Sequence, residues 1–130
     1  MIPTQEAVKM NRAELNEAIA KLQGWTWDGR GIDAKGTPIG RNSDGFLRVR
    51  PDYCGDIAAA WFLWDKLPDR PSHTVGFHAR YEARIYGWVS EPKSYHRGVE
   101  YTSHRRDDVP LLMAAAWYEW HTGTRVELTD

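Results

Sequence analysis

The sequence predicts a single α/β domain of the α+β kind, in which helices pack on a mainly antiparallel sheet of three to four strands. Residues 74–89 alternate between apolar and polar side chains with a period of two, which is typical of half-buried strands. Residues 56–67 and 109–121 are instead rich in alanine, leucine and tryptophan with helical spacing. A chain of 130 residues, 42% hydrophobic and 27% charged, has material for one hydrophobic core.

Residues 11–22 are predicted to form the first helix. Asn11 and Glu14 have the spacing of a capping box, and Gly24 follows the last turn as a typical helix terminator. Glu17 and its neighbour four residues later, Lys21, are spaced to form an ion pair on the exposed face. The apolar face comprises Leu15, Ile19 and Leu22.

Two segments lack any periodicity, residues 1–10 and residues 28–45. The first precedes the helix cap, so we expect a loosely ordered leader there and a single domain over residues 11–130. The second contains five glycines and Pro38, which are too many helix and strand breakers for one regular element. Long loops inside a small domain are generally functional or contain a hairpin, and both alternatives stay open.

The two apolar segments are predicted helices with acidic caps. Asp52 or Asp56 supplies the oxygen that caps the first of them. Asp107 or Asp108 caps the second, and Gly123 closes it. The inward stripe of the first helix is predicted to comprise Ile57, Ala60, Trp61 and Trp64.

Apolar side chains occupy nearly all sides of both predicted helices. Such a helix must be covered nearly all round, and a small sheet covers only one side of it. The remaining surface requires a neighbouring helix, another subunit or a ligand. Because large apolar patches are rare on monomeric proteins, we expect a homo-oligomer, either a dimer or a higher assembly.

The alternating segment predicts a sheet. Residues 74–89 are too long for one strand of ordinary length, about 5 to 6 residues, so we expect two antiparallel strands with a bend near residues 80–83. Residues 98–103 add a third strand. Residues 124–130 form either an edge strand or a frayed tail.

Three segments of the chain resemble a known family. Residues 51–67 read PDYCGDIAAAWFLWDKL, which is similar to the signature of phage ABA sandwich domains, usually written PDYSTDIAAAWELVEKL. Residues 11–25, NRAELNEAIAKLQGW, and residues 109–120, VPLLMAAAWYEW, resemble the first and last helices of these small bacteriophage and prophage proteins. The resemblance implies a three-layer sandwich of helices and sheet. It implies no activity, because most members have none assigned.

Composition and charge exclude several classes of protein. The formal net charge of −1 argues against general nucleic-acid binding, which depends on surplus lysine and arginine. No apolar run approaches the ~18 residues needed to cross a bilayer, so we expect no membrane association. The N-terminus lacks the pattern of a signal peptide, and the single cysteine, Cys54, fits a reducing compartment. The expected location is therefore the cytoplasm, that of a bacterial host if the phage resemblance holds.

The sequence contains no catalytic, metal or cofactor motif. Its five histidines have neither the i,i+4 spacing nor the cysteine partner that a zinc site requires. The glycine-rich loop matches no phosphate-binding pattern. We therefore expect no catalytic residues, no metal and no cofactor, and a protein that is not an enzyme.

Basic and aromatic residues gather in the second half of the predicted sheet and in the loop that follows it. Aromatic rings stack on bases while arginine forks bind phosphates, so this combination favours a nucleotide-like anion. In the alternative interpretation, Tyr86 and Trp88 pack under a helix while the arginines stay solvated. The candidate ligand-binding residues are Arg80, Arg84, Tyr86, Trp88, Tyr95, His96, Arg97 and Arg105.

Two functional hypotheses follow from these features. In the first, the chain is a non-enzymatic phage accessory protein that binds a small anionic nucleotide-type ligand and so sequesters a host defence signal. In the second, it is a phage protein–protein interaction module that inhibits or modulates a host protein without a small ligand.

Overall fold

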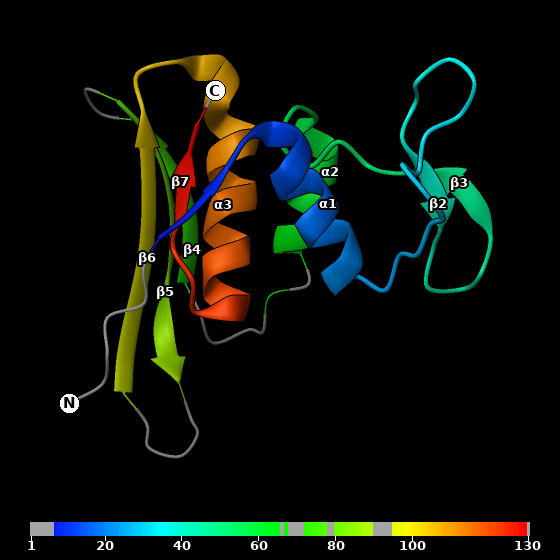
Figure 1. The fold of residues 1–130 in the computed structure, drawn as a ribbon. Coiled ribbons are helices and arrows are strands. Elements are labelled where there is room, and N and C mark those ends of the chain that lie inside the picture. The colour runs from blue at the N-terminus through cyan, green and yellow to red at the C-terminus, as the bar shows by residue number, and fades with distance from the viewer. Residues whose placement is uncertain (1–6, 66, 68–71, 78–79, 90–94, 130) are drawn as a thin grey trace.

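The structure is a computed structural model that describes residues 7–65, 67, 72–77, 80–89 and 95–129. These residues form three α-helices, one 3₁₀ helix and seven strands, which confirms a mixed α+β protein (Figure 1). In chain order the elements are β1 (Val8–Met10), α1 (Arg12–Leu22), β2 (Ile39–Arg41), β3 (Leu47–Val49), α2 (Ile57–Trp64), β4 (Ser72–Phe77), β5 (Tyr81–Val89), β6 (Tyr95–Ser103), η1 (Arg106–Asp108), α3 (Val109–Thr122) and β7 (Val126–Leu128).

The largest sheet among the described residues is antiparallel and has the strand order β4-β5-β6. The register pairs Thr74 with Arg84 across β4 and β5, and Arg84 with Glu100 across β5 and β6. Ala83 and Ile85 are buried, as the alternation of residues 74–89 predicts. The break between β4 and β5 lies just before the expected bend, and β6 begins three residues earlier than residues 98–103.

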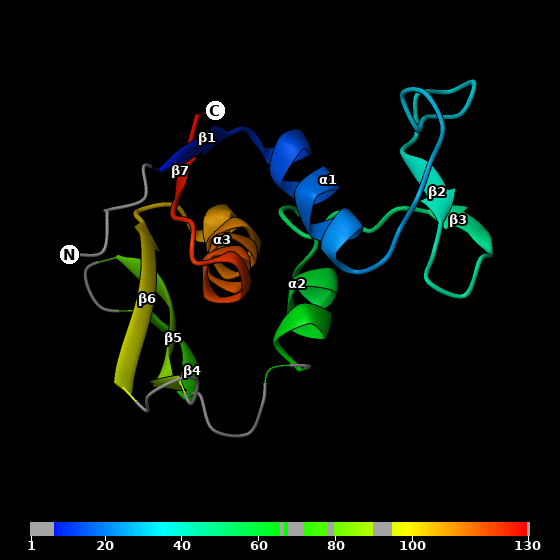
Figure 2. The same ribbon diagram turned by 60° about the horizontal axis from the view of Figure 1, so that its bottom comes forward.

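Helix α3 is the middle layer of the molecule. All eight residues from Pro110 to Trp117 are buried, because the sheet covers one side of α3 and helices α1 and α2 cover the other (Figures 1 and 2). The expectation that a helix apolar on all sides must be covered on all sides is met here. The described helices lie on one side of the sheet, so a three-layer sandwich with helices on both sheet faces is not confirmed.

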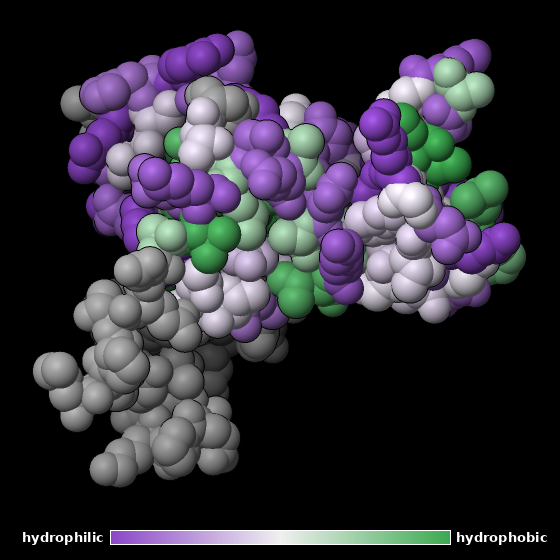
Figure 3. Space-filling model, viewed as in Figure 1, coloured by the Kyte–Doolittle hydropathy of each residue, from purple (hydrophilic) through white to green (hydrophobic). Residues whose placement is uncertain are grey.

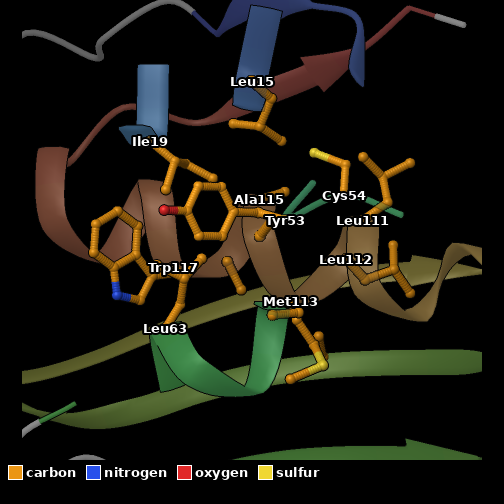
Figure 4. Close-up of a cluster of buried hydrophobic side chains, with 14 of the residues drawn as sticks. Leu15, Ile19, Tyr53, Cys54, Leu63, Leu111, Leu112, Met113, Ala115 and Trp117 are labelled. Carbon is orange, nitrogen blue, oxygen red and sulfur yellow. The ribbon is translucent and has the colours of Figure 1, made fainter. Parts of the chain in front are cut away.

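The core extends from the inner face of the sheet across α3 to the other two helices, and Figure 4 shows its helical part. Trp64 of α2 is fully buried, and its Nε1 donates to the carbonyl oxygen of Met113 at 2.9 Å. Tyr53 is buried beside Leu15 and Ile19 of α1, and burial raises the pKa of the Tyr53 phenol to about 12.

The predicted inward stripe of α2 is right for Ala60 and Trp64 and wrong for Ile57 and Trp61. Ala60, Leu63 and Trp64 are buried, but Ile57 and Trp61 are 44% and 43% exposed. The reason is that α2 packs with only one side on α3, and an all-apolar sequence does not indicate which side that is.

The end of the predicted leader forms a strand, whereas residues 1–6 lie outside the described residues. Val8–Met10 form β1, which pairs in parallel with β7, so that Val8 lies opposite Val126. Three residues are too few for a periodic pattern, and their partner lies at the other end of the chain, so the sequence gives no local signal. Val126–Leu128 of the C-terminal segment form a strand and not a frayed tail, but this strand pairs with β1 in a separate two-stranded sheet and does not extend the sheet β4-β5-β6.

Residues 26–50 form an arm that projects from the helices on the side away from the sheet (Figures 1 and 2). The glycine-rich segment does contain a hairpin, in which β2 and β3 pair antiparallel. Isolated bridges join Thr26 to Arg41 and Ile32 to Pro38, and they hold segments of the arm together. Among the described helices, none is long and apolar enough to cross a membrane.

Candidate functional site

The arginines of the predicted sheet site are already paired with carboxylates. Arg84 contacts Glu82 through Nη2 and Glu100 through Nε, both at 3.1 Å, and Arg80 lies 3.7 Å from Glu82. Glu82 is buried beneath these side chains, whereas both arginines are half exposed. An anion at this place would compete with two carboxylates that the prediction did not include, although Glu82 has the same strand parity as Arg80 and Arg84.

The other predicted sheet residues occupy neighbouring backbone positions. The register pairs Trp88 with His96, Gly87 with Arg97 and Val89 with Tyr95, and it pairs Tyr86 with Gly98. The side chains of residues 86–89 and 95–97 lie outside the described part of the structure, so the ligand site at these residues stays a prediction.

Arg105 lies apart from this group. It is exposed and follows the end of β6, where its backbone N–H donates to Ser103 Oγ at 3.1 Å. Arg97 lies near the start of the same strand, and six residues of extended chain span roughly 20 Å. One small ligand cannot therefore contact both arginines, and the strand length could have shown this beforehand.

A cleft of about 550 Å³ lies between α1 and the arm, far from the predicted site. Its apolar lining comprises Ala13, Pro38, Val49 and Pro51. Its polar lining comprises Arg12, Asn16, Glu17, Arg50 and Asp52. This cleft is the candidate functional site because it is lined by a buried arginine, Arg50, that has no carboxylate partner among the described residues.

Arg50 is a buried cation without a described carboxylate partner. The residue is 7% exposed, and its guanidinium lies over the Trp27 ring at 3.9 Å from the centroid. Its Nη2 donates to the Gly31 carbonyl oxygen at 2.8 Å, whereas Nε is buried and has no hydrogen-bond partner. Burying a charge without a counter-charge costs roughly several kcal/mol. Buried charged groups are therefore generally paired or belong to a binding site.

Two glycines of the arm create the space for this arrangement. Gly31 has φ of 64°, and a Cβ there would lie 2.4 Å from Cδ1 of Trp27. A Cβ on Gly40 would lie 2.8 Å from the Thr26 carbonyl oxygen and 3.5 Å from Cδ of Arg50. The glycines therefore let the indole and the guanidinium stack closely, which a side chain at either position would prevent.

The second arginine of the cleft has its charge neutralised. Arg12 Nη2 contacts Asp108 Oδ1 at 2.8 Å, and Nη1 donates to the Cys54 carbonyl oxygen at 3.3 Å. Burial raises the pKa of Asp108, but the hydrogen bonds from Ser103 and Arg12 and the nearby positive charges outweigh it, so this pKa lies below its usual range. Asp108 was an expected helix cap, yet its side chain makes no capping bond because these two partners engage it.

The two acidic residues of the cleft differ in their partners. Asp52 accepts hydrogen bonds from Asn16 Nδ2 at 2.8 Å and from the Gly55 backbone at 3.0 Å. Glu17 is half-buried, and the described residues provide no cation within ion-pair distance. Its predicted pair with Lys21 is not formed, because the Lys21 ammonium lies over the Trp27 ring instead, 5.4 Å from the centroid.

The outer part of the arm carries exposed apolar side chains, which gather at the right of Figure 3. Phe46 is 57% exposed and Val49 is 61% exposed, and Ile32 and Leu47 are exposed to a similar degree. A shallower hollow of about 360 Å³ is lined by Trp27, Ile32 and Leu47, among others. The arm is therefore a second candidate surface, suited to a protein partner.

The described residues contain no group of three His, Cys, Asp or Glu side chains that could hold a metal ion. The chain matches no model of a known protein family, no curated protein and no solved structure. Function must therefore be inferred from the geometry of the site.

Proposed function

We propose that the protein is a non-enzymatic binding protein, and that it captures a small ligand through an anionic group in the cleft between α1 and the arm. One observation carries the proposal, namely the burial of Arg50 without a described carboxylate partner. A bound anion would supply the missing counter-charge, and charge-assisted hydrogen bonds to a guanidinium are among the stronger ones in proteins.

The size and lining of the cleft support this proposal. Its volume of about 550 Å³ lies within the ordinary range for small-molecule sites, about 300 to 1,000 Å³. Such sites combine mainly apolar walls with a few polar groups that fix the orientation of the ligand. Here two prolines, a valine and an alanine form the walls, and Arg50 is the group that would orient the ligand.

The earlier hypothesis of a nucleotide-type ligand on the sheet stays a prediction. Binding there would require Arg84 to leave Glu82 or Glu100, both of which it contacts at 3.1 Å. The role of a phage accessory protein that sequesters a host defence signal is also a proposal, supported by the sequence resemblance alone.

The proposal is tested by comparing two arginine variants. Isothermal titration calorimetry at low ionic strength is carried out with a panel of carboxylates, inorganic phosphate, AMP and cyclic nucleotides. For any ligand that binds, Arg50→Met should lower the affinity about tenfold or more, as expected for a charge-assisted hydrogen bond of ~1.5 to 3 kcal/mol. Arg48→Met is the matched control, because Arg48 is exposed on the same arm and does not line the cleft.

A further variant separates loss of binding from loss of folding. Arg50→Lys keeps the positive charge but loses the planar fork, so its affinity should lie between those of the wild type and Arg50→Met. Circular dichroism shows whether each variant is folded. Equal affinities of Arg50→Met and Arg48→Met for every ligand that binds would contradict the proposal, as would the absence of binding by the whole panel.

A second candidate function is a protein–protein interaction module that acts on a host protein. The exposed apolar side chains of the arm favour it, because clusters of this kind commonly mark protein-binding surfaces. If it is correct, a double variant with Phe46→Ser and Leu47→Ser, neither of which lines the cleft, should lose a host protein that the wild type retains in affinity purification. The same variant should keep any ligand affinity that depends on Arg50.

A further inference from the structure

We infer that the ligand of the cleft is a small zwitterion with an apolar body, of the class of free apolar α-amino acids. This inference rests on the proposed function, because it specifies the ligand of the same cleft. Among the charged side chains that line the cleft, Arg50 is buried and Glu17 is half-buried, and the described residues give neither an ion-pair partner. Asp52 also lacks an ion-pair partner among them, but it is exposed to solvent. A zwitterion carries the two complementary charges.

The remaining charged groups of the cleft do not alter this balance. Arg12 is held by Asp108 at 2.8 Å, so the charge of its guanidinium is already compensated. Asp52 accepts two hydrogen bonds from its own surroundings, from Asn16 and from the Gly55 backbone. The two charges that are withdrawn from solvent thus require a carboxylate for Arg50 and an ammonium group for Glu17, while the exposed Asp52 is solvated.

Other classes of ligand fit the cleft less well. A phosphate dianion would satisfy Arg50 but would bring two negative charges into a cleft that Glu17 and Asp52 also line. A simple monocarboxylate would leave the half-buried Glu17 without a positive partner. A neutral apolar molecule would leave both Arg50 and Glu17 without a partner of opposite charge. Only the zwitterion satisfies both groups.

The walls of the cleft indicate an apolar body for this zwitterion. Ala13 on α1 and Pro38, Val49 and Pro51 on the opposite side expose hydrocarbon surface but no side-chain hydrogen-bonding group. Val49 is 61% exposed in the free protein, so a ligand side chain that covers it removes apolar surface from water. An aliphatic or aromatic amino-acid side chain matches these walls.

Four related probes test the two charges separately in titration calorimetry. L-phenylalanine carries both charges, N-acetyl-L-phenylalanine only the carboxylate, L-phenylalaninamide only the ammonium group, and phenyl phosphate a dianion. We expect L-phenylalanine to bind at least tenfold more tightly than each of the other three. The complete wild-type chain is used at neutral pH and low ionic strength.

Glu17→Gln provides the matching test on the protein. This variant should reduce the affinity for L-phenylalanine at least tenfold. It should not reduce the affinity for N-acetyl-L-phenylalanine, because the acetylated probe has no ammonium group and gains from the loss of a negative charge. Glu14→Gln is the control, since Glu14 lies on the same helix outside the cleft and glutamine is also accepted at this position of a capping box. It should bind all probes as the wild type does.

The outcomes separate the inference from the proposed function. If N-acetyl-L-phenylalanine or phenyl phosphate binds as tightly as L-phenylalanine, and Arg50→Met abolishes that binding, the zwitterion is excluded while anion capture by Arg50 stands. If Glu17→Gln behaves as Glu14→Gln does, the role of Glu17 is overturned. If none of the four probes binds up to its solubility limit, the ligand is not of this class.

Discussion

Among single residues, Asp108 connects three elements, namely α1, the end of β6 and the start of α3. Its carboxylate accepts from Arg12 Nη2 of α1 at 2.8 Å and from Ser103 Oγ at the end of β6 at 2.6 Å. The residue itself lies at the start of α3. It therefore fixes the position of α1, and with it one wall of the cleft, relative to the sheet.

We predict that Asp108→Asn makes stability less dependent on pH. The pKa of Asp108 is lower in the folded protein than its ordinary value of 3.8, so the folded state binds fewer protons here than the unfolded state does. Its contribution is therefore present above that value and is lost as the pH falls through the folded pKa. At pH 7 the variant should be less stable by about 1 to 2 kcal/mol, and the difference should vanish in acid.

Urea unfolding between pH 7 and pH 2.5 measures this effect. Asp107→Asn is the control, because Asp107 is the exposed neighbour on the same short 3₁₀ helix. A constant difference between Asp108→Asn and the wild type over this pH range would contradict the assignment.

Tyr101 performs a similar role at the edge of the sheet. Its hydroxyl donates to Glu119 Oε1 at 2.8 Å and accepts from the buried Val126 N–H at 2.8 Å. Burial raises the pKa of the Tyr101 phenol well above its ordinary value, so it remains protonated in the folded protein.

We predict that Tyr101→Phe lowers the free energy of unfolding by about 1 to 3 kcal/mol, because it leaves the Val126 N–H buried without a partner. Denaturant unfolding gives the magnitude, and amide hydrogen exchange gives the location. The Val126 amide should exchange faster than in the wild type. Once the change in global stability is subtracted, the protection of amides in α1 should be unchanged. An unchanged exchange rate at Val126 would contradict the role of the hydroxyl.

At the scale of elements, α2 depends on its cap more than most helices do. It has only eight residues, and Asp56 Oδ1 accepts from the Ala58 N–H at 3.0 Å. Short helices depend on capping and on packing, since isolated helices of this length do not persist in water. Asp65 at the opposite end places a negative charge beside the carbonyl end of the helix dipole.

We predict that Asp56→Ala destabilises the protein by about 1 kcal/mol, the ordinary cost of losing an N-cap. Asp65→Ala is the matched control, because it removes the same charge from the unfavourable end and should leave stability unchanged or slightly higher. Thermal unfolding of both variants measures the difference. Equal destabilisation by the two substitutions would show that the loss of a negative charge, and not the loss of the capping hydrogen bond, is responsible.

The elements were predictable wherever the local sequence determines them. The capping box of Asn11 and Glu14, the αL glycine at Gly123 and the alternation of residues 74–89 are each local signals, and the structure has a helix start, a helix end and two strands at these places. The exposed side of α2 was not predictable, because an all-apolar helix has no polar face. Strand β1 escaped prediction because its partner is distant in the sequence.

The candidate site was less predictable than the fold, for a related reason. Arg50 follows Leu47, Arg48 and Val49 in an unremarkable alternation, and nothing local distinguishes it from the exposed Arg48. Its burial results from contacts with Trp27 and Gly31, which lie about twenty residues earlier. By contrast, the pairing of Arg84 with Glu82 could have been anticipated, since the two residues have the same strand parity.

At the scale of the whole molecule, the arm and the helical layer form the two sides of the cleft. The bridges of Thr26 and Ile32 and the stacking of Arg50 on Trp27 lie within the arm and hold its segments together. The sheet lies on the far side of α3 and makes no part of the cleft among the described residues (Figure 1). Ligand binding at the cleft and any partner bound at the sheet would therefore use separate surfaces.

The exposed side of α2 leads to the last prediction, which concerns assembly. Ile57 and Trp61 lie one helical turn apart and are 44% and 43% exposed, on a helix that has no charged residue. Burying such a side chain stabilises an interface by ~1.5 to 3 kcal/mol, and a two-fold axis would place the same residues of a second copy against it.

We therefore expect a homodimer through α2, and light scattering at micromolar concentration should give twice the chain mass of 15.0 kDa. Trp61→Glu should yield the monomer, whereas Phe46→Glu on the arm should leave the dimer intact. A wild-type mass of 15.0 kDa, or dissociation by Phe46→Glu alone, would exclude α2 as the interface.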